Sequence, residues 1–378
     1  MNSASRAPVK YYRPELDWLR FMAFSAVFVH HAFPKVEESY SALGMPSILA
    51  QVIAPLARSG AYGVDLFFAL SAFLITELLL LERERTGRIH ILSFYVRRVL
   101  RIWPLYYAFI LAVCPFEILL RGNPVSYYAM LLTFTGNLYG EFGDPYFLSV
   151  CLALWSVCIE EQFYIVWPNL MARLKPARFG MALVAIMAFT CVCRAFYVYG
   201  VPPTPGTVWS NTLTRLDPFA LGGLLALVLH NRNWILPGIA RGCALLAGIG
   251  VFWFLGTFPF AGQFFEFPVW SYPAAAVASV LCILAFVSAP PRPAYSRPLR
   301  VLSYLGKISY GLYVFHCGAI AFSEHILPDD GLDAWLWVSR ALIAGVLTLS
   351  AAMVSYARLE KPFLMMKRRY SFIESRPA

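Results

Sequence analysis

The sequence predicts an all-α polytopic membrane protein with about ten transmembrane helices, a polar interior and both termini in the cytoplasm. Hydrophobic residues make up 59% of the 378 residues, charged residues only 14%, and the mean hydropathy is +0.62. Soluble domains are about 45–50% apolar and about 25% charged, so a soluble enzyme of this composition lacks the polar surface it needs. A disordered chain and a disulfide-stapled secreted fold are excluded on the same grounds.

Ten stretches are long and apolar enough to cross the hydrocarbon core of a bilayer, which takes about 20 residues. They lie near 16–33, 60–81, 102–120, 147–171, 179–198, 212–230, 242–257, 268–289, 302–322 and 335–357. The chain then divides into a cytoplasmic segment (1–15), a transmembrane domain (16–357) and a basic cytoplasmic tail (358–378). A shorter and more polar stretch, 125–139, is expected to be a re-entrant or surface element.

The charge distribution favours this topology. The net charge is +10, from 31 Lys and Arg against 21 Asp and Glu. With both ends inside, most basic residues fall on cytoplasmic segments, as the positive-inside rule requires. If 125–139 crossed the membrane, Arg173, Lys175 and Arg178 would lie outside. The excess of Lys and Arg is thereby explained by the topology of the chain in the lipid bilayer. We therefore expect no nucleic-acid partner.

The eight cysteines all fall in apolar stretches, and no Cys-His cluster has zinc-site spacing. We interpret them as free thiols that act as small core residues, and we expect no metal site. The P-loop, GxGxxG, HExxH and GxSxG motifs are absent, so ATP-driven transport and metalloprotease chemistry lack support.

Charged side chains inside the spans are the candidate functional residues, because a charge near the bilayer centre must face the bundle interior. Arg20 and His31 are separated by three turns of helix plus about 20°, so they share one face, about 16 Å apart along the axis. His30 is turned about 80° away from Arg20, which makes His31 the inward histidine, in the outer half of the span. The alternative is a histidine that anchors the helix end at the interface.

Asp65 lies at about the depth of His31 and is expected to orient its imidazole or hold its protonated form. The alternative is an acidic residue placed at a helix N-terminus by the helix dipole. A second intramembrane histidine, His316, is interpreted as a hydrogen-bonded bundle residue rather than a catalyst.

Glu160 and Glu161 are adjacent carboxylates in one span, and their side chains point about 100° apart. One is expected to face a cavity and the other to pair with a neighbouring span, through Arg194 or Arg215. A purely structural ion pair is the alternative.

Three arginines, Arg97, Arg98 and Arg101, lie at the cytoplasmic entrance of the third span. Arg97 and Arg101 are one helical turn apart on one face. Guanidinium groups suit phosphates, so these residues predict a site for a phosphorylated cytoplasmic ligand. Ordinary positive-inside anchoring is the alternative.

Taken together, these residues resemble the acyltransferase-3 family of integral membrane O-acyltransferases. Arg20-x10-His31 matches the family signature, and further similar segments occur at 12–20, 63–76, 97–104, 154–164, 308–316 and 359–363. Three positions depart from the usual pattern: Trp18 and Ala72 replace common glycines, and His30 replaces a common tyrosine. The chain resembles the stand-alone form of the family, without a C-terminal esterase-like domain.

The resemblance implies transfer of an acyl group, expected to be acetyl, from cytoplasmic acyl-CoA to a hydroxyl of a carbohydrate or glycolipid acceptor at a bacterial cytoplasmic membrane. The implied catalytic residues are His31, Arg20, Asp65 and Glu160, and the implied CoA-binding residues are Arg97, Arg98 and Arg101. His31 would act as general base or acyl carrier, and Arg20 would steady the donor or the developing oxyanion. Acyl-CoA is the expected co-substrate, with no metal.

Two other functions remain open at this point. A proton-coupled secondary transporter or flippase, for a glycan or a small metabolite, also suits ten spans with a buried Arg, His and Glu set. A sensor or scaffold without activity is the third possibility. The arginine cluster discriminates among them, because a carrier needs no CoA site and acetyl-CoA would not stabilise it against heat.

Overall fold

The structure is a computed structural model that describes residues 9–139, 149–200, 207–232, 234–258, 267–290, 296–328 and 334–374. Helices make up nearly all of the regular structure in these ranges. The strands found there are the two-residue β1 (Val9–Lys10) and β2 (Ile373–Glu374), which pair in parallel. The prediction of an all-α fold is therefore confirmed.

Six helical segments in the described ranges are long and apolar enough to cross a membrane, which makes the chain a multi-pass integral membrane protein. They are Ser47–Thr86, Ile91–Arg121, Pro176–Tyr199, Gly238–Gly256, Val269–Val287 and Trp335–Tyr370. The other predicted spans are also helical, but α11 (Asp217–Leu229) has only 13 residues. The count of ten spans and the orientation of the termini remain predictions.

The elements follow one another without large insertions in the described ranges. Their order is α1 (Pro14–Ala32), α2 (Glu37–Ser41), α3 (Ser47–Ser59), η1 (Gly60–Tyr62), α4 (Gly63–Thr86), α5 (Ile91–Arg121), α6 (Val125–Leu132), η2 (Gly136–Leu138), η3 (Leu152–Leu154), α8 (Trp155–Arg173), α9 (Pro176–Tyr199), α10 (Thr207–Ser210), η4 (Thr212–Thr214), α11, α12 (Gly238–Gly256), α13 (Phe267–Val287), α14 (Arg297–Lys307), α15 (Ser309–Ile326), α16 (Ala334–Ser355), η5 (Tyr356–Glu360), α17 (Lys361–Lys367) and η6 (Arg368–Tyr370).

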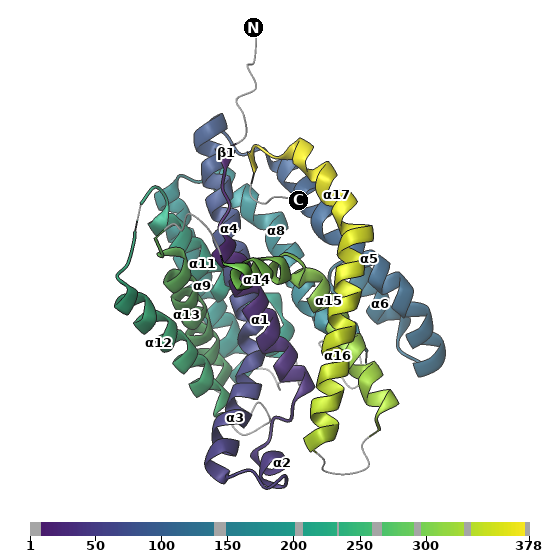
Figure 1. Ribbon diagram of the computed structural model, residues 1–378. Coiled ribbons are helices and arrows are strands. Elements are labelled where there is room, and N and C mark those ends of the chain that lie inside the picture. Colours follow the sequence, from purple (N-terminus) through teal and green to yellow (C-terminus); the bar gives the residue numbers. More distant parts are fainter. Residues whose placement is uncertain are drawn as a thin grey trace.

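Two predicted elements differ from the structure. The expected span 302–322 is broken at Ile308, where α14 ends and α15 begins. Helix α14 lies across α1 (Figure 1), and the two backbones touch: a Cβ on Gly306 would lie 1.8 Å from the Asp17 carbonyl oxygen. The stretch 125–139 forms α6, whose eight residues span only about 12 Å, so it does not cross.

Helices α1 and α4 form the centre of the bundle (Figure 1). Helices α9, α11, α12 and α13 pack on one side of this centre, and α5, α15, α16 and α17 lie on the other. Helix α4 approaches α11 closely because Gly222 has no Cβ; one would lie 2.3 Å from the Ala69 carbonyl oxygen. This close contact holds α4 against α11, and α4 forms one wall of the candidate site described below.

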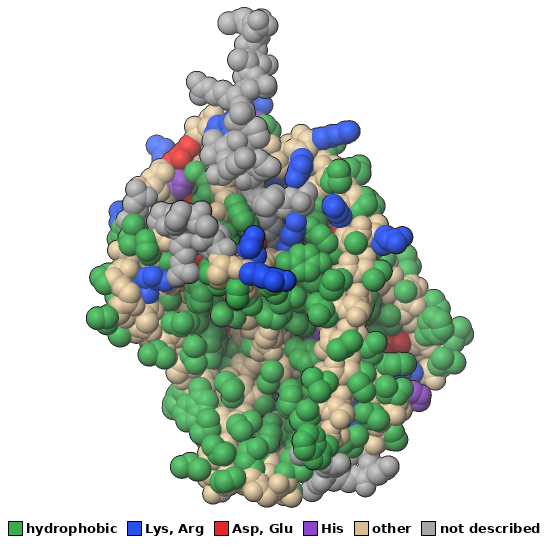
Figure 2. All heavy atoms as spheres, viewed as in Figure 1, with side chains coloured by type: hydrophobic (Ala, Val, Ile, Leu, Met, Phe, Trp, Pro, Cys, Tyr) green, Lys and Arg blue, Asp and Glu red, His purple; other side chains and the backbone are tan. Residues whose placement is uncertain are grey.

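Lys and Arg side chains gather at the end of the molecule where β1 and β2 pair (Figures 1 and 2). The visible sides below this end are mostly hydrophobic, as a lipid-facing surface requires. Part of the chain on which the predicted topology rests lies outside the described residues. It comprises Arg6, Arg292, Arg376 and the start of the expected span 147–171.

Candidate functional site

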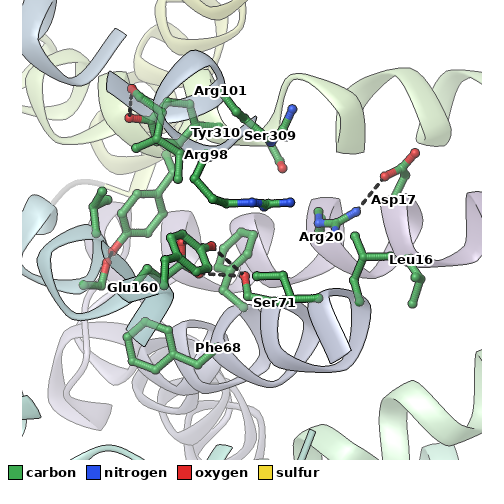
Figure 3. Close-up of a pocket in the computed structure, with 18 of the residues that line it drawn as sticks. Leu16, Asp17, Arg20, Phe68, Ser71, Arg98, Arg101, Glu160, Ser309 and Tyr310 are labelled. Carbon is green, nitrogen blue, oxygen red and sulfur yellow. Dashed lines mark hydrogen bonds and ion pairs between the residues drawn. The ribbon is translucent and has the colours of Figure 1, made fainter. Parts of the chain in front are cut away.

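A pocket opens between α1, α4, α5, α8, α15 and α17, and Figure 3 shows how residues that line it lie. It holds about 1100 Å³ of empty space, counting the part that is open to solvent. Four of the residues that the sequence singled out line it: Arg20, Arg98, Arg101 and Glu160. The fold thus brings together charges from α1, α5 and α8, which are far apart in the sequence.

The pocket is strongly cationic. Arg13, Arg20, Arg98, Arg101 and Lys367 line it, against the carboxylates of Asp17 and Glu160. Asp17 is already engaged, since Arg20 donates to its Oδ1 at 2.9 Å and Tyr12 donates to its Oδ2 at 3.1 Å.

Arg98 and Arg101 keep their charge available to a ligand. Figure 3 shows both side chains directed into the space that Arg20 also faces. Within the described part of the chain, neither arginine forms an ion pair or a hydrogen bond with a carboxylate, and nor does Lys367. Arg98 instead lies over the rings of Phe94 and Tyr164, each 5.4 Å from its guanidinium carbon. Such unpaired cations are suited to bind an anionic ligand.

Glu160 forms the inner wall of the pocket. Ser71 donates a hydrogen bond to its Oε1 at 2.8 Å, and Tyr164 donates one to its Oε2 at 3.1 Å. Glu161 points away and accepts a hydrogen bond from the Trp103 indole at 3.0 Å. The prediction that the two carboxylates diverge is confirmed, but the expected pairing with Arg194 or Arg215 is wrong.

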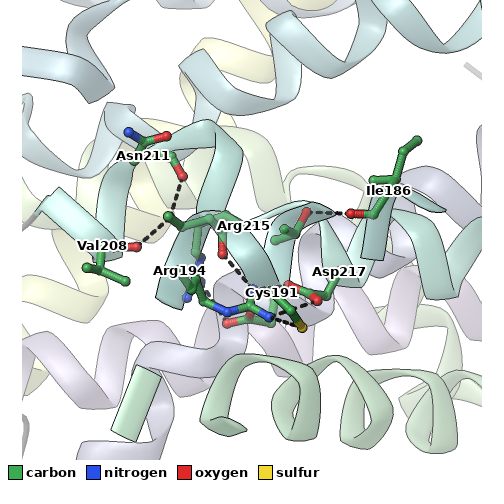
Figure 4. Close-up of polar contacts among 10 residues, drawn as sticks. Ile186, Cys191, Arg194, Val208, Asn211, Arg215 and Asp217 are labelled. Atoms are coloured by element: carbon green, nitrogen blue, oxygen red, sulfur yellow. Dashed lines mark hydrogen bonds and ion pairs between the residues drawn. The ribbon is translucent and has the colours of Figure 1, made fainter. Parts of the chain in front are cut away.

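Those two arginines have other partners. Arg194 forms an ion pair with Asp217 (Figure 4), and Arg215 donates to Asp65 at 2.9 Å. All four side chains are fully buried. Arg215 also lies over the rings of Tyr272 and Trp209, at 4.2 and 4.5 Å. The expectation that Asp65 orients His31 is therefore wrong, because Arg215 takes its carboxylate.

Arg97 does not line the pocket, although helix spacing groups it with Arg101. It donates to Glu82 at 2.9 Å and to the Tyr370 carbonyl at 2.8 Å. Glu82, on α4, neutralises Arg97 and turns it toward the C-terminal segment. The arginines available to a ligand are thus Arg98 and Arg101, and Arg97 holds the segment that follows α17.

His31 lies beyond the pocket, at the far end of α1. It lines a second cavity, with about 580 Å³ of empty space, together with Ser323, Glu324, Trp337 and Arg340. Its ring centroid is 5.3 Å from that of His316, a buried histidine on α15. Arg20 and His31 share α1, as predicted, yet face two different cavities.

Tyr313 separates the two cavities. It lines the basic pocket, its ring centroid is 5.3 Å from that of His316, and its hydroxyl lies 2.7 Å from the Ser156 hydroxyl. The ring of Phe67 packs edge-on against it, at 5.8 Å. The Tyr313 ring therefore links the basic pocket to His316, whose ring in turn contacts that of His31.

Sequence reasoning missed three pocket residues, Ser71, Tyr310 and Lys367. Ser71 and Tyr310 lie in segments of the family resemblance, but they are uncharged and were given no role. Lys367 belongs to a run of basic residues after the last span, and only the fold of α17 places it in the pocket.

The fold and this site define a multi-pass membrane protein with a basic pocket and a histidine-lined cavity beyond it. The chain belongs to the acyltransferase-3 family, whose model, described as an acyltransferase domain, matches residues 13–357. No solved structure matches the chain.

Several curated bacterial proteins are similar to nearly the whole chain. The peptidoglycan O-acetyltransferase OatA of Listeria monocytogenes is 26% identical over 373 residues, 93% of this chain and 56% of that protein. A putative O-acetyltransferase of Staphylococcus aureus is 26% identical over 377 residues, 93% of this chain and 57% of that protein. The putative peptidoglycan O-acetyltransferase YrhL of Bacillus subtilis is 26% identical over 373 residues, which cover 93% of this chain and 55% of that protein. The chain spans about half the length of these relatives.

Proposed function

We propose that the protein is a membrane O-acetyltransferase that moves an acetyl group from cytoplasmic acetyl-CoA to a hydroxyl of a carbohydrate acceptor on the other side of the membrane. The single observation that carries this proposal is the basic pocket, in which Arg98, Arg101 and Lys367 have no carboxylate partner among the described residues. The names of the relatives support acetyl as the group and a glycan as the acceptor.

The orientation follows from the same pocket. Coenzyme A is a cytoplasmic ligand with several phosphates, so the basic end faces the cytoplasm. The first and last described elements, β1 and β2, lie at that end (Figure 1), and we propose ten crossings between them. The clustering of Lys and Arg at this end (Figure 2) agrees with the positive-inside rule.

In this scheme Arg98, Arg101 and Lys367 hold the phosphates of the donor. Arg20 lies deeper along α1, where its charge steadies the donor within the pocket. The acetyl group, still joined to the CoA sulfur, passes the Tyr313 and Phe67 side chains to reach His31. Glu160 keeps Ser71 and Tyr164 in place along the pocket wall.

His31 acts as the general base in the second cavity. It accepts the proton of the acceptor hydroxyl while that oxygen attacks the thioester carbon. The carbon–sulfur bond then breaks, the acetyl ester forms, and the CoA thiolate takes up the proton. Trp337, Arg340 and Glu324 line the same cavity and offer a sugar an aromatic face and hydrogen-bonding groups. We propose that the acceptor binds there.

The test is thermal unfolding of the purified protein in detergent, with and without acetyl-CoA. Removing one charged contact in Arg98→Ala is expected to weaken donor binding roughly 10- to 100-fold. The control is Arg173→Ala, which removes an exposed arginine outside the pocket. If acetyl-CoA stabilises Arg98→Ala as well as the wild type, the pocket is not the donor site. If it stabilises neither, a carrier function is favoured.

A further inference from the structure

Three side chains with metal-ligand atoms form a cluster at the second cavity. His31 comes from α1, and His316 and Cys317 come from α15. One ligand-type atom of each, a ring nitrogen or the sulfur, lies within 4.8 Å of the other two. The spacing rules of the sequence did not detect this group, because the fold brings His31 to residues that lie near the other end of the chain.

The His316 ring is oriented as a metal ligand would be. Its Nδ1 lies 2.5 Å from the Tyr313 carbonyl oxygen, so that nitrogen carries the proton and donates it. Its Nε2 keeps its lone pair and lies 3.3 Å from the Cys317 sulfur. Histidines that bind metals commonly donate their other N–H to a carbonyl in this way, which fixes the ring and the tautomer.

His31 is the member of the cluster that faces the second cavity. Within the described ranges, no hydrogen bond engages its ring nitrogens, and the side chain is exposed to the cavity of about 580 Å³. A cation can therefore reach the cluster through this cavity. The same space leaves room for a water molecule as a further ligand.

The donor set selects the kind of metal. Two imidazoles and a thiol suit Zn²⁺ and other thiophilic divalent cations, whereas Mg²⁺ and Ca²⁺ take oxygen ligands. Nitrogen and sulfur ligands at zinc distances of about 2.1 and 2.3 Å lie about 3.5 Å apart in a tetrahedral site. The 3.3 Å between the His316 nitrogen and the Cys317 sulfur is close to this separation.

We propose that His31, His316 and Cys317 form an inhibitory binding site for Zn²⁺ or a similar thiophilic cation, with water as the fourth ligand. Bonds form from the metal to two ring nitrogens and to the Cys317 sulfur, whose proton is released to solvent. The inhibition rests on the proposed function, because the metal occupies the nitrogen with which His31 would accept the acceptor proton.

The first experiment measures binding without activity. The purified full-length protein is titrated with Co²⁺, whose bond to a thiolate gives a charge-transfer absorption in the near ultraviolet, and Zn²⁺ is then added as competitor. Wild type is expected to bind one cation. Cys317→Ser is expected to lose the absorption and at least about 10-fold in Zn²⁺ affinity, as is typical when a metal site is disrupted. The matched control is Cys243→Ser, which changes an exposed cysteine on α12.

Absence of the absorption in wild type, or its persistence in Cys317→Ser, overturns the site. His316→Asn provides a second variant and is expected to weaken binding to a similar extent. Wild-type unfolding temperatures for both variants would show that lost binding is not a loss of fold.

The second experiment measures acetyl transfer at increasing Zn²⁺. Wild type is expected to be inhibited and to recover when a chelator is added. Cys317→Ser is expected to keep its activity and to need at least about 10-fold more Zn²⁺ for half inhibition. Equal inhibition of both proteins contradicts the proposal. If cobalt binds but no variant transfers acetyl, the proposed function fails and the metal site stands; transfer without metal binding gives the opposite result.

Discussion

Arg215 and Asp65 form an ion pair at 2.9 Å in which both side chains are fully buried, and this pair ties η4 and α11 to the N-terminal turn of α4. The rings of Tyr272 and Trp209 cover the Arg215 guanidinium. Water therefore cannot readily take the place of the Asp65 carboxylate if that carboxylate is removed. The pair therefore holds together the wall of the bundle behind the basic pocket.

Removing the carboxylate alone is expected to be severe. Asp65→Asn leaves the Arg215 charge buried and unpaired, and the free energy of unfolding should fall by about 3–5 kcal/mol. Thermal unfolding in detergent measures the loss. The double variant Asp65→Leu with Arg215→Leu should recover most of it, because apolar replacement of a whole buried pair is often neutral. This account would be contradicted if the double variant lost as much stability as Asp65→Leu and Arg215→Leu lose separately when their losses are added.

The effect of Lys367 on donor binding can be distinguished from the effect of removing any positive charge from α17. If it holds a donor phosphate, Lys367→Ala should raise the KM for acetyl-CoA roughly 10-fold and leave kcat nearly unchanged. Steady-state transfer assays give both constants. Lys361→Ala, on an exposed position of the same helix, is the control and should behave as wild type. A fall in kcat without a change in KM would argue for another role.

Donor binding and chemistry should respond differently to changes at His31. His31→Ala is expected to lower kcat by about 10²–10⁴-fold, as is typical for loss of a general base. Acetyl-CoA should still raise its unfolding temperature, because His31 lies outside the basic pocket. His30→Gln is the matched control, since its amide can keep the contact that the His30 Nδ1 makes with the Ala57 carbonyl at 3.0 Å. Full transfer by His31→Ala would refute the assignment.

The contact between α14 and α1 gives a prediction about stability alone. A Cβ on Gly306 would collide with the Asp17 carbonyl oxygen, so Gly306→Ala should lower the free energy of unfolding by about 1–3 kcal/mol. Gly238→Ala is the control, because nothing lies within 4 Å of a Cβ at that position. Its unfolding temperature should equal or exceed that of wild type. Equal behaviour of the two variants would show that α14 moves freely on α1.

The sequence was most informative where one helix decides the outcome. The spacing of Arg20 and His31 follows from helix geometry, and both residues do lie on α1. The divergence of Glu160 and Glu161 follows from the same geometry, and the structure shows it.

Helix spacing was not sufficient where a distant partner decides. Arg97 is neutralised by Glu82, and no rule of spacing along α5 reveals that neighbour. Asp65 is likewise paired with Arg215, and Lys367 enters the pocket because α17, which continues from α16 through η5, packs against α5. Such pairings depend on which helices touch, and a single sequence without aligned relatives contains no direct record of that.

The segment after the last span has a consequence for how the protein is made. Lys367 completes the basic pocket, and the backbone beyond it is held by Arg97 at Tyr370, by Arg85 at Phe372 and by the pairing of β2 with β1. A ribosome must therefore synthesise the chain through Lys367 and on to β2 before the pocket has all its walls. If the protein works as proposed, chains that are translated only through the earlier helices would be unable to capture acetyl-CoA.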